Sequence, residues 1–219
     1  MATKTRTKKR KLKKKRILIA LLVVIVLIAI GGFGVYYVTS NKKEVRAVAT
    51  VTDEIGNGYN YTITDDATDY SKELFADLKK ELSKDQVDEE KYATLETQLF
   101  ISEFFTLANK INRNDVGGVQ FIYADYQESF QKEAMEHLYH YVENDLYGDR
   151  EQELPEIVNV DVINVEQKEY TLNDTTADEE AYYVDVTMNY AKDLGYQKSA
   201  TVVLMHNEKR LDIVKMTEK

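Results

Sequence analysis

Two of the three histidines in the chain are spaced as metal ligands can be. His137 and His140 stand three residues apart in a segment whose periodicity predicts a helix, so their imidazoles would be neighbours on it. Glu136 and Glu143 lie nearby, but no H-E-x-x-H pattern is present, and a third ligand would have to come from elsewhere, for instance His206. Histidines without a metal are far commoner on helices, so no metal site is predicted.

A second pattern could support nucleophilic catalysis. Ser129-Phe130-Gln131-Lys132 matches S-x-x-K, in which a lysine one turn from a serine helps to activate its hydroxyl. The companion S-D-N and K-T-G elements are absent, and Ser40-Asn41-Lys42-Lys43 matches equally well in a predicted linker. No catalytic residue is therefore predicted, and we expect a protein that is not an enzyme.

Two acidic clusters could hold calcium. They consist of Asp65, Asp66 and Asp69, and of Asp174, Asp178, Glu179 and Glu180. Neither has the D-x-[DN]-x-[DN]-G spacing with a distant glutamate, so we interpret both as solvated loops. The glycine-containing turns Gly56-Asn57-Gly58 and Gly117-Gly118 do not resemble phosphate loops, and no cofactor is expected.

Tyrosine is abundant for a chain without tryptophan. There are sixteen tyrosines, and several gather in one segment: Tyr123, Tyr126, Tyr139, Tyr141 and Tyr147. We expect most to be packed in a core. An exposed subset would form a binding surface, because tyrosine is favoured at protein interfaces.

An uncharged stretch near the start of the chain is long enough to cross a membrane. It runs from Ile17 to Val38 without a charged side chain. At about 1.5 Å per helical residue it would span about 33 Å, against roughly 30 Å for the hydrocarbon core of a bilayer. Tyr36 and Tyr37 at its end suit the water interface. We predict a transmembrane helix over residues 17–38.

The segments on the two sides of this stretch carry opposite charge. Residues 1–16 hold ten Lys or Arg and no acid, whereas the rest of the chain holds 19 basic residues and all 38 acids. Positive charge stays on the cytoplasmic side, so the N-terminus is expected inside and residues 39–219 outside. The residues expected to contact anionic lipid are Lys8, Lys9, Arg10, Lys11, Lys13, Lys14, Lys15 and Arg16. Nucleic-acid binding is not expected, because no aromatic residues are interleaved with these basic residues.

A cleaved signal peptide is the alternative to a retained anchor. Its apolar region normally runs for about 7–15 residues, fewer than here, and the only A-x-A sequence, Ala47-Val48-Ala49, lies well past Val38. The chain has no cysteine, which excludes a disulfide framework and a lipid-modified cysteine. This composition suits a Gram-positive bacterium.

In the first half of the predicted extracytoplasmic part, the sequence pattern indicates a hairpin followed by helices. Residues 39–64 are predicted to be a linker and a β-hairpin, with alternation over 45–52 and 59–63 around Gly56-Asn57-Gly58. A helix capped by Asp69 or Ser71 carries Leu74, Leu78 and Leu82. The second helix, capped by Asp85, has apolar positions from Tyr92 to Ile111, and the third spans about Val119 to Leu146.

The second half reads as strands. Pro155 marks the change, and alternating runs follow at 158–162, 182–190, 199–206 and 211–216, with an acidic loop over 173–180. Short links favour an antiparallel meander. The predicted fold class is α+β: a transmembrane helix, then a helical layer packed on a curved antiparallel sheet. The expected divisions are a cytoplasmic arm (1–16), the membrane helix (17–38), linker and hairpin (39–64), and an extracytoplasmic α+β domain (65–219).

The order of these elements resembles the nuclear transport factor 2-like (cystatin-like cone) superfamily. The resemblance rests on the helical pair 89–111 and 119–146 and on the closing hairpin "ATVVLMHNEKRLDIVKM". It covers about residues 90–219, and it implies membrane-anchored relatives among conjugation and type IV secretion subunits and Gram-positive envelope proteins. The hairpin at 45–64 is extra, and a tryptophan common in the last strand is absent. No functional residue is carried over.

The sequence therefore predicts a non-enzymatic, single-pass membrane protein. Its outer domain would bind other envelope proteins in a secretion or conjugation channel or in the cell-wall machinery. The sequence does not decide whether the chain also forms a homo-oligomer. The alternative is small-ligand binding or catalysis in the pocket of a cone-type domain, with a polar group supplied by Glu103, His137 or His206.

Overall fold

A computed structural model describes residues 45–173 and 176–219. The residues from Val45 to Lys219 belong to one folding unit, which includes the hairpin. The predicted basic arm (1–16) and transmembrane helix (17–38) lie outside the described residues. Among the residues that are described, no helix has the length and apolar character needed to cross a membrane.

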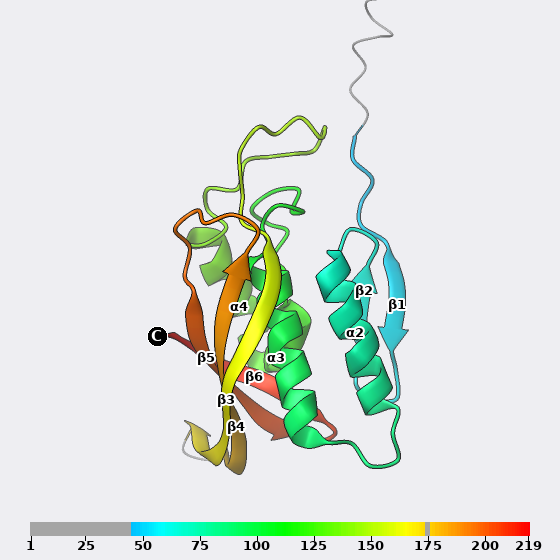
Figure 1. Ribbon diagram of the computed structural model, residues 1–219, viewed down its shortest axis with the longest axis vertical. Helices are drawn as coiled ribbons and strands as arrows, with labels where there is room; N and C mark the ends of the chain where they lie inside the picture. The colour runs from blue at the N-terminus through cyan, green and yellow to red at the C-terminus, as the bar shows by residue number, and fades with distance from the viewer. Residues whose placement is uncertain (1–44, 174–175) are drawn as a thin grey trace, which may run out of the picture. The chain divides into compact units, whose positions relative to one another are not determined.

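The described part is an α+β fold in which helices pack on a curved antiparallel sheet, as expected (Figure 1). Its elements, in chain order, are β1 (Val51–Ile55), β2 (Tyr61–Thr64), α2 (Asp69–Leu82), α3 (Glu89–Phe105), the 3-10 turns η1 (Val119–Phe121) and η2 (Ala124–Tyr126), α4 (Gln127–Glu136), β3 (Ile157–Asn173), β4 (Thr176–Tyr190), β5 (Ser199–Asn207) and β6 (Arg210–Glu218).

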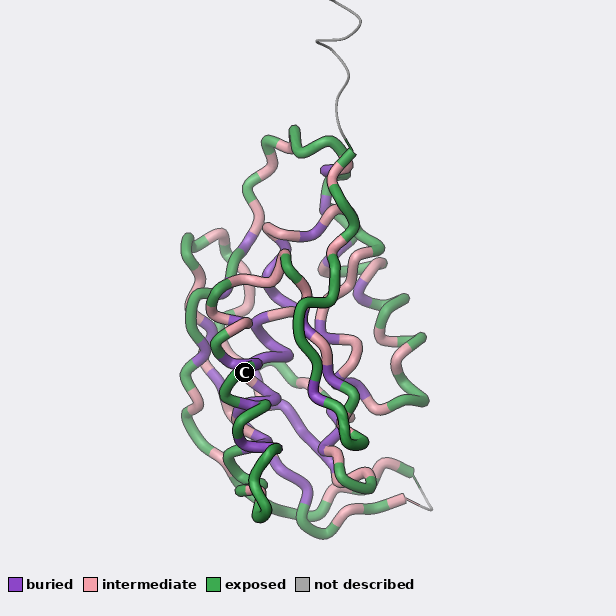
Figure 2. The backbone as a smooth tube through the Cα atoms, turned by 90° about the vertical axis from the view of Figure 1, so that its right-hand side faces the viewer, coloured by how far each residue is buried: buried purple, intermediate pink, exposed green. Residues whose placement is uncertain are grey.

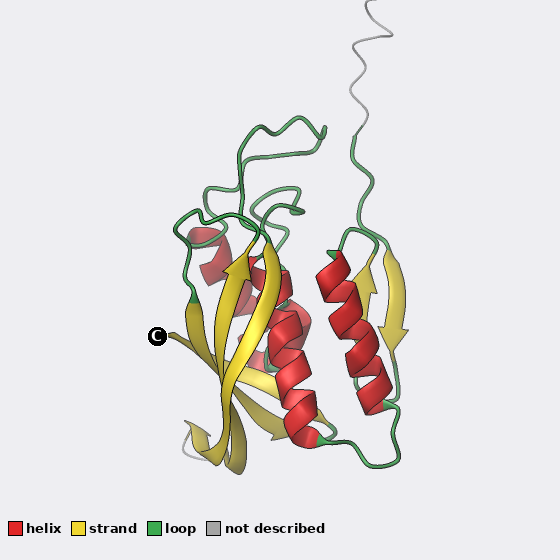
Figure 3. Ribbon diagram, in the orientation of Figure 1, coloured by secondary structure: helices red, strands yellow, loops and turns green. Residues whose placement is uncertain are grey.

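The last four strands form the predicted antiparallel meander, in the order β3-β4-β5-β6. Register shifts interrupt the β3–β4 pairing at several points, and such bulges add bend and twist to a sheet. Helix α3 contacts β3 and β4, and α2 packs on α3, with the β1–β2 hairpin beyond α2 in the view of Figure 3. Buried residues run through the middle of the unit, where α3 meets the sheet (Figure 2).

Capping residues begin both long helices. Thr68 accepts a hydrogen bond from the Ser71 amide at the start of α2, and Asp88 accepts one from the Lys91 amide at the start of α3. The predicted caps, Asp69 or Ser71 and Asp85, are therefore wrong by one to three residues. Leu74, Leu78 and Leu82 are buried as predicted, and α3 is buried on several sides.

Helix α3 ends at Phe105, not near Ile111 as predicted. Thr106 leaves the helical conformation (φ −83°, ψ 99°), and its hydroxyl oxygen accepts a hydrogen bond from the Ile157 amide, 3.1 Å away. The amide of Leu107 donates to the carbonyl oxygen of Pro155 (2.9 Å). Hydrogen bonds to the segment that starts β3 thus replace the helical ones, which periodicity alone does not reveal.

The prediction of one long helix over 119–146 is also wrong, because α4 is the only α-helix in this range. Tyr123 is extended (φ −49°, ψ 130°), and its amide donates to the carbonyl oxygen of Ile213 in β6. After α4, His137 leaves the helix (φ −119°, ψ −93°). The Tyr139 hydroxyl then donates to the Phe104 carbonyl oxygen (2.8 Å) and accepts from the Gly117 amide (3.1 Å). Hydrogen bonds to segments that are distant in the sequence thus replace helical ones before and after α4.

The strand predictions fail at three places. Residues 45–50 are not a strand, and the Arg46 amide instead donates to the Leu146 carbonyl oxygen (2.8 Å). The acidic loop expected over 173–180 is largely strand, because β3 reaches Asn173 and β4 begins at Thr176. A register shift near the start of β3 also turns Val158 outward, although it was placed on one face with the buried Val160.

Candidate functional site

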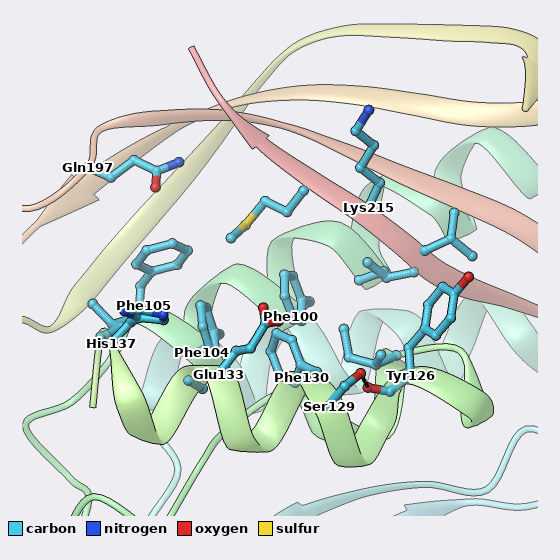
Figure 4. Close-up of a pocket in the computed structure, with 16 residues that line it drawn as sticks. Phe100, Phe104, Phe105, Tyr126, Ser129, Phe130, Glu133, His137, Gln197 and Lys215 are labelled. Atoms are coloured by element: carbon cyan, nitrogen blue, oxygen red, sulfur yellow. Dashed lines mark hydrogen bonds between the residues drawn. The ribbon is translucent and has the colours of Figure 1, made fainter. Parts of the chain in front are cut away.

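The candidate binding site is an apolar cavity between α4 and β6, with a volume of about 470 Å³ (Figure 4). Helix α3 supplies its floor, α4 one wall and β6 the other. Pockets for small ligands usually measure about 300–1,000 Å³ and are mainly apolar. The cavity therefore has the size and lining of a site for an apolar group.

Aromatic rings on two helices give the cavity its apolar surface. Phe100 and Phe104, one turn apart on α3, are stacked with ring centroids 5.6 Å apart. Phe130 of α4 lies over both, at 6.0 Å from Phe100 and 5.0 Å from Phe104. Phe105 contacts Phe104 edge to face at 5.0 Å. Rings packed this way hold each other in place, so the cavity is formed before any ligand enters it.

The wall formed by β6 is also the edge of the sheet. Ile213 pairs with Ile122 in an isolated parallel bridge, and this is where the 119–123 segment meets the strand. Among described residues, no strand pairs with the outer edge of β6 from Val214 to Glu218. A free edge with unpaired backbone groups thus borders the cavity, which is the arrangement that accepts an added strand.

Polar side chains also contribute to the lining of the cavity. Ser129, Glu133 and His137 line the cavity, but the Ser129 hydroxyl donates to the Tyr126 carbonyl oxygen, 2.9 Å away. In the described structure no hydrogen bond joins Ser129 to Lys132, the two residues of the S-x-x-K pattern.

The two spaced histidines are not brought together on a helix. His137 is the residue that caps the end of α4, and His140 lies in the turn beyond it with its ring edge-on to Tyr141. Within residues 45–173 and 176–219, no group of three or more histidine and acidic side chains is placed to hold a metal ion. His206 lies near the end of β5.

His206 instead belongs to an ion-pair cluster. Its Nδ1 lies 2.8 Å from Asp178 Oδ2 and its Nε2 lies 3.4 Å from Glu89 Oε2, and its amide also donates to Asp178. Partial burial lowers the pKa of His206, but the bonds and charges of Asp178 and Glu89 outweigh it and raise the pKa above the usual value. Asp178 is therefore engaged by protein groups.

The first acidic cluster is also engaged by protein groups. Asp65 accepts from the Thr50 amide, and Asp66 accepts from the Thr64 hydroxyl at 2.6 Å. Asp69 lies in the first turn of α2, where an acid suits the positive end of the helix. Of the second cluster, Asp174 lies outside the described residues, while Glu179 and Glu180 are exposed on β4.

Glu103, a candidate polar group for the apolar cavity, faces a different one. It lines a separate polar cavity of about 260 Å³ at the other side of α3, together with Lys110, Gly118 and Gln120. Burial raises the pKa of Glu103 to about 7, against the lowering effects of the Lys110 charge and of the bonds from Gln120 and Gly118. His137 is thus the only one of the three named candidates at the apolar cavity.

The sequence interpretation missed a charged network in the core. Glu96 is fully buried, and its Oε2 accepts from the Tyr61 hydroxyl (3.1 Å), which is 2.6 Å from the Tyr92 hydroxyl. Burial raises the pKa of Glu96 well above its usual range, and the charge of Arg210 opposes this. The available signal was its place one turn after Tyr92 and one before Leu99, on the apolar stripe of α3.

The tyrosines divide into buried and exposed groups, as the composition suggested. Tyr61, Tyr92 and Tyr139 are among the largest fully buried side chains. Tyr126 and Tyr141 are exposed, at 37% and 77%, and Tyr126 lies at one end of the apolar cavity. A tyrosine at the mouth of an apolar cavity is suited to a protein interface.

No protein-family model, curated protein or solved structure matches this chain. The likeness to the nuclear transport factor 2-like superfamily therefore stays a prediction, and it rests on the order of helices and strands alone.

Proposed function

We propose that this chain is a non-enzymatic, single-pass protein of the cell membrane whose extracytoplasmic domain binds other envelope proteins. The observation that carries the proposal is the uncharged stretch 17–38 between a basic arm and a body with twice as many acids as bases. Such a stretch is retained in the bilayer as a helix, with the arm on the cytoplasmic side. A secretion or conjugation channel or the cell-wall machinery of a Gram-positive bacterium is the proposed setting.

Tethering supplies the mechanism. A domain confined to a thin layer above the membrane meets partners in the same layer at a high effective concentration, so contacts of modest affinity suffice. The basic arm adds attraction to anionic lipid of about 1 kcal/mol per charge. The protein would act by holding its outer domain where an assembly is built.

The apolar cavity is the proposed contact point. An extended partner segment that pairs with β6 between Val214 and Glu218 would satisfy backbone groups of the sheet edge. One of its apolar side chains would then reach the rings of Phe104 and Phe130. Main-chain pairing would supply affinity and the aromatic cavity would supply specificity.

The topology gives the first prediction. Protease added to whole, wall-stripped cells is expected to digest residues 45–219 and to leave an arm-plus-helix fragment in the membrane, because only the body is outside. The measurement is immunoblotting with separate tags at the two ends. A body that resists protease in intact cells but is cleaved after lysis would contradict the orientation, and a mature chain found free in the medium would show a cleaved signal.

The cavity gives the second prediction. Met216→Arg places a charge in the lining of the cavity and is expected to lower the yield of cross-linked partner in intact cells at least about tenfold. Ile163→Arg adds the same charge to an exposed residue of β3, away from the cavity lining and the β6 edge, and is expected to leave the yield unchanged. Recovery of the wild-type chain alone under all cross-linking conditions would count against partner binding.

The same cavity supports a second candidate, binding of a small apolar ligand. Its volume of about 470 Å³ and aromatic floor favour this. Solvent extraction of the purified chain followed by mass spectrometry separates the two, because a stoichiometric small molecule that Met216→Arg removes would indicate ligand binding.

A further inference from the structure

Four of the eight large apolar side chains that are exposed in the described residues lie in two segments, 45–48 and 141–147. They are Val45, Val48, Tyr141 and Tyr147, with Val48 at 82% exposure and Tyr141 at 77%. Single exposed apolar residues are ordinary on a protein surface, whereas a group of them marks an interaction surface. We refer to these four residues as the valine–tyrosine patch.

Polar contacts hold the two segments of the patch together. The Arg46 amide donates to the Leu146 carbonyl oxygen (2.8 Å), and the Arg46 guanidinium forms an ion pair with the buried Asp145. Val45 precedes Arg46 and Tyr147 follows Leu146, so these two exposed side chains come from neighbouring stretches of backbone. The patch is therefore one surface, although its residues lie about a hundred positions apart in the sequence.

The patch lies at one end of the folding unit. In Figure 1 the start of the described chain and the 139–150 loop are both at the top of this unit, and the connection between α2 and α3 is at the bottom. The patch shares no residue with the lining of the apolar cavity. A surface that contacts the patch therefore does not need to fill that cavity.

The sequence limits how far this end of the unit can lie from the uncharged stretch. Val45 comes seven residues after Val38, and a chain extends by at most about 3.3–3.6 Å per residue, which gives at most about 25 Å. This limit holds for any conformation of the residues between them. If residues 17–38 cross the membrane, as in the function proposed above, the patch is held within reach of the outer surface of the bilayer.

We propose that the valine–tyrosine patch docks on the outer surface of the bilayer that anchors the chain, an inference that rests on the proposed function. A tyrosine ring with its polar hydroxyl suits the boundary between hydrocarbon and water, and the valines remove apolar surface from water there. The contact is intramolecular, so a small apolar area suffices. The folding unit would then stand with the α2–α3 connection directed away from the membrane (Figure 1).

The charge around the patch decides which lipid it fits. Glu143, Asp149 and Glu151 are exposed on or beside the loop, and Arg150 is the only basic residue between positions 143 and 151. The loop is therefore net negative, and an anionic bilayer would repel it. The contact is apolar and favours a zwitterionic surface, unlike the ionic contact proposed for the basic arm.

Fluorescence quenching on the full-length chain tests the docking. The chain has no cysteine, so Glu143→Cys gives a single labelling site in the loop, and Gln86→Cys gives one at an exposed residue of the α2–α3 connection. Each labelled chain is placed, one copy per disc, in phosphatidylcholine nanodiscs with and without a nitroxide-labelled lipid. The nitroxide is expected to quench the dye at position 143 and to leave the dye at position 86 unquenched.

Removing apolar side chains tests the patch itself. Val48→Ser/Tyr141→Ser, added to the Glu143→Cys chain, is expected to lower the ratio of docked to free domain at least about tenfold, and the quenching falls with it. Val158→Ser/Ile163→Ser, at two exposed apolar residues of β3, is the matched control and should be quenched like the parent chain. All four residues are exposed, so both double variants are expected to fold.

The possible contrary results have different meanings. Equal signals at positions 86 and 143, or quenching at position 143 that Val48→Ser/Tyr141→Ser leaves unchanged, would overturn the docking. Stronger quenching in discs that contain phosphatidylglycerol would show an ionic contact in place of the apolar one. Shielding of position 143 that requires two chains per disc would assign the patch to a second copy of the chain. A chain that does not enter the discs at all would contradict the proposed membrane function itself.

Discussion

Arg210→Met is expected to lower the free energy of unfolding by about 3–5 kcal/mol, the largest loss that we predict for a single substitution. Arg210 Nε donates to Asp212 Oδ1 (2.9 Å), and its two Nη atoms donate to the carbonyl oxygens of Tyr59 (2.7 Å) and Gln120 (2.6 Å). Its guanidinium also lies 4.6 Å from the centre of the Tyr61 ring. One side chain thus joins the hairpin, the loop after α3 and β6.

The expected loss of stability follows from Asp212, whose buried carboxylate no longer has its charged partner when Arg210 is replaced. Asp212 is only 2% exposed, and without Arg210 its remaining side-chain donor is Asn207 Nδ2 (2.6 Å). An uncompensated buried carboxylate is far more costly than the ion pair is favourable. The double variant Arg210→Met/Asp212→Asn should therefore recover part of the stability.

Urea unfolding followed by circular dichroism measures these changes. Lys209→Met, at the exposed residue next to Arg210, is the control and should stay within about 0.5 kcal/mol of the wild type. A loss below about 1 kcal/mol for Arg210→Met would show that the network does not stabilise the fold. No recovery in the double variant would show that Asp212 is not the cause.

The predictable parts of the fold are those in which the spacing of apolar residues along the sequence matches the spacing of buried positions. Leu74, Leu78 and Leu82 repeat with the period of a helix and are buried on α2. Val184, Val186 and Met188 alternate with period two on β4, and the short turn at Asn207–Lys209 predicted the antiparallel order of the last two strands. Burial of one face imposes these patterns on the sequence directly.

The ends of the helices were not predictable in this way. Leu138 continues the apolar stripe of α4 in sequence, but the hydroxyl of its neighbour Tyr139 bonds to Phe104 and Gly117, and the helix has already ended. Those partners lie at least 22 residues away in the sequence. The periodicity of apolar residues within one segment cannot show that a hydrogen-bond partner is available far away in the sequence.

The charged side chains of the interior were hidden for the same reason. Glu96 lies on the apolar stripe of α3, but a glutamate there and a lysine at position 110 are residue types that usually face solvent. What makes them unusual is the set of groups around them, drawn from α3, β6 and the 115–120 loop. Such sites emerge only when these segments are placed together.

Glu103→Gln is expected to remove a component of pH dependence that amounts to up to about 3 kcal/mol. The pKa of Glu103 is raised from 4.5 to about 7, so the folded state keeps a proton that the unfolded state releases. That stabilisation is complete below pH 4.5 and is lost as the pH rises through about 7. The wild type should therefore lose stability over this range relative to the Gln variant.

Unfolding free energies measured from pH 4.5 to 8 test whether the wild type loses stability relative to Glu103→Gln as the pH rises. His206 also has a raised pKa and lowers stability as the pH rises through its folded pKa, but it is present in both chains, so the difference between wild type and Glu103→Gln isolates Glu103. A constant difference across the range would show that Glu103 titrates alike in both states.

Lys110 provides the sharper test of the electrostatic cause. Its charge lowers the pKa of Glu103, so Lys110→Met should move the midpoint of the Glu103 transition above pH 7. A midpoint that the substitution does not move would show that the Lys110 charge does not act on Glu103.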